Sequence, residues 1–95
     1  MEISKEMWIK IFPALKSDKR FQLLEYFNGK EELVSYTTTK EENEFTDGNL
    51  VYHLNLLLSA GLIVNKTKKT EFGRHPHSFY EITPLGKQVL EMLTT

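Results

Sequence analysis

One stretch of the chain decides its fold: residues 46–64, with the sequence TDGNLVYHLNLLLSAGLIV. Apolar side chains recur there at intervals of four and three residues, the spacing of one face of an α-helix: Leu50, Leu54 and Leu57. Thr46 is a suitable N-cap, and Asp47 places a negative charge at the positive end of the helix dipole. Gly61 is typical of the residue that ends a helix. The stretch therefore predicts a helix over residues 46–61, followed directly by a strand.

A hairpin and a last helix follow from that strand. Residues 62–69 and 78–83 have the apolar and β-branched content of two strands, and the polar segment between them contains Gly73 and Pro76. Thr83 then precedes a proline, the residue most suited to the first position of a helix. We expect this helix to run to about Leu93.

Two helices precede the decisive stretch. The first is predicted over residues 3–15, with Ser4 as its N-cap and an end or kink just before Pro13, because proline clashes with the preceding turn. The second is predicted over residues 18–27, with a left-handed cap at Asn28 and Gly29.

The segment between these helices and the decisive stretch has mixed signals. Residues 33–39 are rich in β-branched side chains and predict a short strand, whereas residues 40–44 are polar and favour an irregular helix or a loop.

The order of these elements predicts an α+β, mostly helical fold: a winged helix-turn-helix with a two-stranded wing and flanking N- and C-terminal helices. We expect a single domain over residues 1–95. Within it, residues 1–16 and 84–95 are the flanking helices, residues 46–61 the recognition helix and residues 62–83 the wing hairpin.

Three motifs resemble one group of families in the same order along the chain. Residues 12–24 (FPALKSDKRFQLL), the stretch 46–64 and residues 73–87 (GRHPHSFYEITPLGK) are similar to winged-helix repressors of the ArsR and MarR-like class. The resemblance implies a homodimeric, DNA-binding transcription regulator that acts as a repressor. It also implies that the helix over 46–61 enters the major groove while the wing holds the backbone or the minor groove.

Composition excludes several other classes of protein. The chain has 40% hydrophobic and 26% charged residues, so it is neither disordered nor fibrous in type. It contains no cysteine, which excludes disulfides and thiolate metal sites. No apolar run is long enough to span a membrane and the N-terminus lacks the features of a signal peptide, so we expect a cytoplasmic protein that binds no membrane. No constellation of catalytic residues and no phosphate-binding glycine loop is present, and we expect neither an enzyme nor a cofactor.

Helical spacing also predicts the residues that read DNA. Opposite the leucine face lie polar and aromatic side chains suited to contacts with base edges or phosphates: Asn49, Tyr52, His53 and Asn55.

The wing carries the second predicted contact surface. Between residues 65 and 77 four basic residues oppose one acid, a net charge of +3 in a chain whose overall charge is −1. We expect phosphate or minor-groove contacts there, from Lys66, Lys68, Lys69, Arg74, His75 and His77. The two histidines lack further ligands for a metal.

The sequence also indicates a second copy of the chain as a partner and, as an alternative function, binding to another protein. The apolar stripes of the flanking helices predict a homodimer interface that contains Met7, Trp8, Ile11, Val89, Leu90 and Leu93. The helix over 46–61 carries no lysine or arginine, which motivates an alternative: a protein-interaction module. In that reading Tyr52, Leu56 and Leu58 form an apolar contact, and the acidic residues between 31 and 47 face a basic partner of unknown identity.

Overall fold

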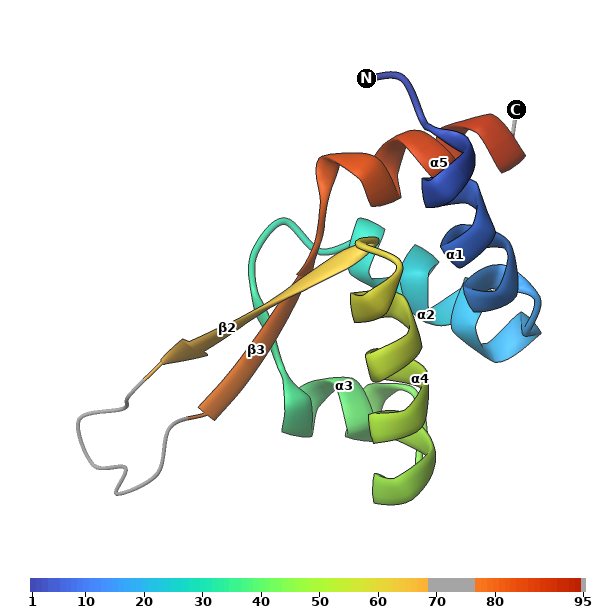
Figure 1. The fold of residues 1–95 in the computed structure, drawn as a ribbon. Helices are drawn as coiled ribbons and strands as arrows, with labels where there is room; N and C mark the ends of the chain where they lie inside the picture. Colours follow the sequence, from blue (N-terminus) through green and yellow to red (C-terminus); the bar gives the residue numbers. More distant parts are fainter. Residues whose placement is uncertain (69–76, 95) are drawn as a thin grey trace.

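The computed structural model describes the backbone of residues 1–68 and 77–94, and the side chains of residues 1–67 and 78–94. Figure 1 shows the elements along the chain, which are α1 (Lys5–Leu15), α2 (Asp18–Asn28), β1 (Val34–Ser35), α3 (Tyr36–Glu42), α4 (Asp47–Ser59), β2 (Ile63–Lys68), β3 (His77–Ile82) and α5 (Pro84–Thr94). This arrangement confirms the predicted winged helix-turn-helix class, and the predicted helix over 46–61 and hairpin correspond to α4, β2 and β3.

The sheet has three antiparallel strands in the order β1-β3-β2. β2 pairs with β3 from Ile63 opposite Ile82 out to Lys68 opposite His77. β1 adds a short third strand, with Val34 opposite Tyr80. The sequence predicted a two-stranded wing, and the third strand arises because Val34 is buried against the core.

One core joins the helices to the sheet. The leucine face of α4 is almost completely buried, with Leu50, Leu54 and Leu57 each at most 1% exposed. It packs against apolar side chains of the other elements, among them Ile11, Leu23, Leu24, Phe27, Leu62 and Val89. The burial of this face leaves the opposite side of α4 in contact with solvent.

Pro13 lies inside α1, so the predicted helix end before the proline is wrong. Ser4 is the N-cap as expected, and its hydroxyl accepts a hydrogen bond from the Met7 amide at 3.2 Å. The last turn persists because Ala14 is buried in the core and because Arg20 donates hydrogen bonds to the carbonyl oxygens of Pro13 and Ala14. These contacts compensate for the helix hydrogen bond that a proline cannot make.

Residues 36–39 form the first half of α3, and the predicted strand there is wrong beyond Ser35. The Ser35 hydroxyl caps the helix by accepting a hydrogen bond from the Thr38 amide at 3.1 Å. Thr39 is fully buried, and its hydroxyl donates to the Ser35 carbonyl oxygen at 2.8 Å. Capping and burial therefore override the β preference of three consecutive threonines.

Two loop glycines differ in conformation. Gly61 has a φ of +75°, as expected for the glycine that ends α4. Gly29 has a φ of −79°, so the predicted left-handed cap of α2 is wrong. There the chain remains right-handed because the Gly29 amide continues the helical pattern with a 3.1 Å hydrogen bond to Glu25.

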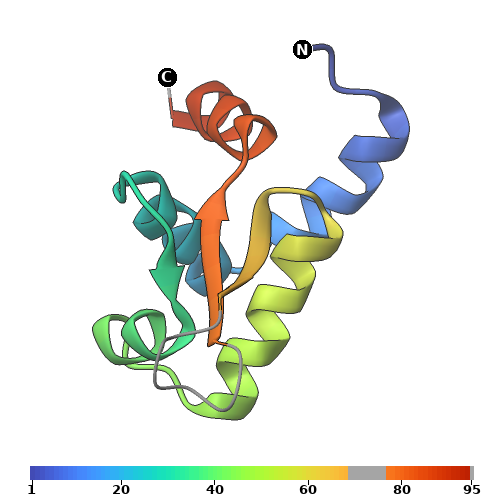
Figure 2. The same ribbon diagram turned by 90° about the vertical axis from the view of Figure 1, so that its left-hand side faces the viewer.

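The two ends of the described chain lie at the same end of the molecule (Figures 1 and 2). The first turn of α4 lies at the opposite end, and the described parts of β2 and β3 extend to one side of it. None of the helices in the described ranges is long and apolar enough to cross a bilayer.

Candidate nucleic-acid interface

The start of α4 is fixed by α3. The Asp47 carboxylate accepts from Lys40 Nζ at 3.0 Å and from the Tyr36 hydroxyl at 3.1 Å. These contacts with Lys40 and then Tyr36 hold the pKa of Asp47 below its ordinary value. Burial and the same hydrogen bond raise the pKa of Tyr36. The two helices of the helix-turn-helix are thus joined at the point where α4 begins.

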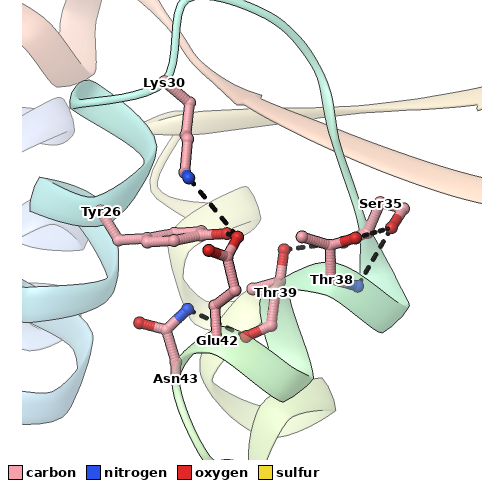
Figure 3. Close-up of polar contacts among 7 residues, drawn as sticks. All are labelled: Tyr26, Lys30, Ser35, Thr38, Thr39, Glu42 and Asn43. Atoms are coloured by element: carbon pink, nitrogen blue, oxygen red, sulfur yellow. Dashed lines mark hydrogen bonds and ion pairs between the residues drawn. The ribbon is translucent and has the colours of Figure 1, made fainter.

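A second group of contacts fixes α3 against α2. Figure 3 shows the Tyr26 hydroxyl and Lys30 Nζ converging on Glu42 Oε1, at 2.6 and 3.4 Å. The hydrogen bond from Tyr26 lowers the pKa of Glu42, while burial and Glu42 together raise the pKa of Tyr26. At the same end of α3, the Asn43 amide donates to the Thr39 carbonyl oxygen at 2.9 Å. α4 therefore contacts a helix whose C-terminal end is itself fixed to α2.

The outer face of α4 carries three of the four side chains of this helix that were predicted to contact DNA. Asn49 and Asn55 are exposed, and Tyr52 is 59% exposed. Sequence reasoning did not single out Val51, which is 47% exposed on the same helix. Its position one residue after Leu50 places it about 100° away from the buried face, so helical periodicity was sufficient to find it.

His53 lies at the edge of this face, half-buried against α2. Its Nδ1 atom is 3.1 Å from Arg20 Nη1, and its ring lies 5.5 Å from that of Phe45. Burial, followed by the positive charges of Arg20 and Lys19, lowers the pKa of His53. The sequence placed His53 among the DNA contacts and did not predict its link to Arg20, because the two residues are 33 positions apart.

The wing is described only in part. Lys66 Nζ forms an exposed ion pair with Glu81 Oε1 at 2.8 Å. Lys68 and His77 are the last described backbone pair of the hairpin. Their side chains lie outside the described residues, as do Lys69, Arg74 and His75.

The residues predicted for a dimer interface divide into two groups. Ile11, Val89 and Leu90 are buried in the core of the chain. Met7 and Trp8 are half-buried, and Leu93 is 49% exposed. Trp8 and Leu93 line an apolar groove of about 470 Å³ between α1 and α5, together with Ile11, Phe12, Pro13, Leu15 and Lys16.

Within the described ranges, no three His, Asp or Glu side chains are grouped closely enough to hold a metal ion. The candidate interface consists of a polar and apolar helix face, a flanking Arg–His contact and a hairpin whose sequence is basic.

Comparison with known proteins agrees with this geometry. The family model of the winged helix DNA-binding domain matches residues 19–94. A search of curated protein sequences finds no match.

Solved structures resemble the whole chain at low sequence identity. A protein from Porphyromonas gingivalis, described as a MarR-family transcriptional regulator, is 22% identical with a TM-score of 0.71 over 98% of this chain and 89% of its own. HlyU from Vibrio cholerae is also 22% identical, with a TM-score of 0.69 over 98% and 94%. Staphylococcus aureus MepR, solved as a complex with DNA, is 18% identical with a TM-score of 0.69 over 97% and 76%. At these identities the likeness shows a shared fold.

Proposed function

Because the chain belongs to the winged helix DNA-binding domain family, we propose that it is a sequence-specific transcriptional regulator, a repressor that competes for promoter DNA. The family consists of DNA-binding domains and not of enzymes, in agreement with the sequence-based expectation. The observation that carries the proposal is the outer face of α4. This face is exposed and carries polar and apolar side chains, while the leucine face behind it is buried and the first turn is fixed by Tyr36 and Lys40.

In this proposal α4 enters the major groove. Asn49, Tyr52 and Asn55 contact base edges, because amide groups pair with adenine and an aromatic ring packs against a thymine methyl group. His53 lies at the flank of α4, where its Nε2 atom contacts a phosphate.

The wing supplies the electrostatic part of the contact. Lys66, Lys68, Lys69 and Arg74, with His75 and His77, hold phosphates or enter the minor groove. Lys66 is paired with Glu81 in the free protein and exchanges this partner for a phosphate. An exposed ion pair is weak enough to exchange for a phosphate.

A homodimer completes the proposal. Phe12 is 62% exposed and its ring stacks on that of Trp8, with centroids 4.9 Å apart beside the groove between α1 and α5. Burial of this surface by a second copy removes apolar area from water. Two joined modules then bind two half-sites about one helical turn of DNA apart.

The alternative of a protein-interaction helix is not supported by the position of Leu58. That side chain packs partly buried against the core and does not share an exposed patch with Tyr52.

Fluorescence anisotropy with labelled duplexes across a salt series tests the function. We expect binding that weakens with salt, with a log–log slope of about −0.9 per neutralised phosphate. Charge reversal of Lys68 and Lys69 to Glu is expected to abolish binding. The matched control reverses Lys5 and Lys10 on α1 and retains binding. Absence of binding to any duplex at low salt would contradict the proposed function.

Sedimentation tests the dimer separately. Leu93→Glu is expected to give a monomer, whereas Val51→Glu, an equally exposed apolar position on α4, leaves the dimer intact. A wild-type chain that sediments as a monomer at micromolar concentration would contradict the dimer.

A further inference from the structure

The outer face of α4 carries no positive charge. From Asp47 to Ser59 the helix contains no lysine or arginine, and its exposed side chains after Asp47 are Asn49, Val51, Tyr52, Asn55 and Ser59. We propose that α4 selects A·T base pairs at the positions it contacts in the major groove, with Asn55 on adenine and Val51 and Tyr52 on thymine methyl groups. This inference rests on the proposed function and adds the composition of the DNA target to it.

The three side chains form one patch. Asn55 follows Val51 by four residues and Tyr52 by three, and residues at these spacings are neighbours on a helix surface. All three lie away from Leu50, Leu54 and Leu57, which are buried. Asn55 is therefore flanked by two apolar or aromatic side chains on the same exposed surface.

The chemistry of this patch matches A·T pairs. An asparagine amide both donates and accepts, as do adenine N6 and N7, and an apolar side chain fits the C5 methyl group of thymine. Guanine presents two acceptors, N7 and O6, which are best bound by the paired donors of arginine or by lysine. α4 offers neither residue.

Cytosine is also disfavoured by the state of Asp47. A carboxylate is the usual acceptor for the N4 amino group of cytosine. Asp47 is the acidic residue of the first turn of α4, and its carboxylate already accepts hydrogen bonds from Lys40 and Tyr36 within the protein.

Tyr52 is held in place before DNA binds. The Arg20 guanidinium carbon lies 5.8 Å from the centre of its ring, and the His53 ring lies 5.5 Å away on the same helix. A side chain that is already ordered loses less conformational entropy on binding. The aromatic part of the patch is thus prepared for contact with a base.

The first arm of the test is selection from a pool of duplexes with a randomised centre, followed by sequencing. We expect enrichment of A·T pairs in the half-sites. Enrichment of G·C pairs, or binding without any base preference, would overturn the inference while leaving DNA binding intact. If no duplex is retained at low salt, the proposed function fails and the inference fails with it.

The second arm locates the contact in the major groove. In an enriched duplex, replacing dA by 7-deaza-dA removes the N7 acceptor, and we expect a loss of affinity of about 5- to 150-fold at the position read by Asn55. Replacing dT by dU removes the methyl group and is expected to weaken binding about fourfold, the equivalent of one buried methyl group. If neither replacement weakens binding, the preference arises from the minor groove and the assignment to α4 is wrong.

Two variants complete the test. Val51→Ala is expected to bind duplexes with dT or dU at the position contacted by Val51 equally, because that methyl contact is lost, while the contact of Tyr52 is kept. The matched control is Val64→Ala, which changes an exposed valine of β2 and keeps the preference for dT. Asn55→Ala is likewise expected to bind 7-deaza-dA and dA duplexes equally. The inference would be overturned if Val51→Ala still preferred dT over dU and Asn55→Ala still preferred dA over 7-deaza-dA.

Discussion

Arg20 joins the start of α2 to α4 through His53, with 3.1 Å between Arg20 Nη1 and His53 Nδ1. A guanidinium group only donates hydrogen bonds, so Nδ1 accepts and the neutral imidazole carries its proton on Nε2. The same guanidinium donates from Nε to the Ala14 carbonyl oxygen at 2.7 Å and from Nη2 to that of Pro13 at 3.3 Å. One side chain thus connects the end of α1, the start of α2 and the middle of α4.

Loss of this connection is expected to destabilise the fold. Arg20→Met keeps much of the apolar stem but removes the side-chain donors of the Ala14 and Pro13 carbonyl oxygens. Arg20 is only 9% exposed, so we expect the free energy of unfolding to fall by about 1–3 kcal/mol. Urea denaturation monitored by circular dichroism measures the change. Lys19→Met, the same charge change at an exposed neighbour, is the control and is expected to cost under about 0.5 kcal/mol. Equal effects of both variants would contradict the structural role of Arg20.

Stability is also expected to depend on the protonation of His53. Its pKa in the folded protein lies below the ordinary value of about 6.5, because burial and then Arg20 and Lys19 disfavour the charged form. Between these two values the unfolded chain binds a proton that the folded chain does not. Above about pH 6.5, His53 therefore does not change the free energy of unfolding. As the pH falls below about 6.5, its protonation in the unfolded chain lowers the free energy of unfolding.

The comparison of wild type with His53→Gln isolates this effect. The groups facing His53 are Arg20 and Lys19 from α2 and the rings of Phe45 and Tyr52. His75 and His77 are common to both chains, so their contribution cancels. We expect the stability difference between the two proteins to change between pH 7.5 and 5, in favour of the variant at low pH. If the stability difference between wild type and His53→Gln is independent of pH, protonation of His53 does not affect the stability of the fold.

The sequence predicted the parts of the fold that follow from local spacing. The leucines of α4 determined both its position and its outer face, so Asn49, Tyr52 and Asn55 were identified correctly as exposed. The first half of α3 was missed because its β-branched residues have local preferences that Ser35 capping and the burial of Thr39 override.

The contacts that shape the interface could not be predicted in the same way. Arg20 and His53, or Lys40 and Asp47, meet only after the chain has folded, and no periodic pattern links them. α1 continued past Pro13 for a similar reason, since its last turn depends on Arg20 of the following helix.

Gly86 is expected to be required for the packing of α5. A Cβ atom at this position would overlap the Leu62 carbonyl oxygen and lie 2.7 Å from Cγ1 of Ile82. We expect Gly86→Ala to lower the free energy of unfolding by about 1–3 kcal/mol, the usual cost of overpacking. Gly48→Ala is the matched control, because nothing lies within 4 Å of a Cβ atom added at this position. Alanine also favours the helix over glycine by up to about 1 kcal/mol. Thermal denaturation of both variants checks the prediction, and a Gly86→Ala protein as stable as wild type would contradict the close packing.

Asp47 is expected to stabilise α4 while weakening its contact with DNA. Its carboxylate lies in the first turn, where it interacts favourably with the helix dipole, but it also pairs with Lys40 and repels phosphates. Asp47→Asn is therefore expected to lower the free energy of unfolding by about 0.3–1 kcal/mol. The same change is expected to tighten duplex binding at low salt about two- to fivefold, since an exposed charge pair is worth under about 1 kcal/mol.

A free Lys40 adds one phosphate contact, so the salt dependence of binding by Asp47→Asn is expected to steepen by up to about 0.9 in the log–log slope. Glu6→Gln is the matched control, because Glu6 occupies the first turn of α1, whose N-terminal end lies at the opposite end of the molecule. It is expected to lower stability similarly and leave DNA affinity unchanged. Anisotropy titrations of the three proteins measure both affinity and slope. Weaker binding by Asp47→Asn would mean that the carboxylate itself contacts a base, and that the pair with Lys40 opens when α4 meets DNA.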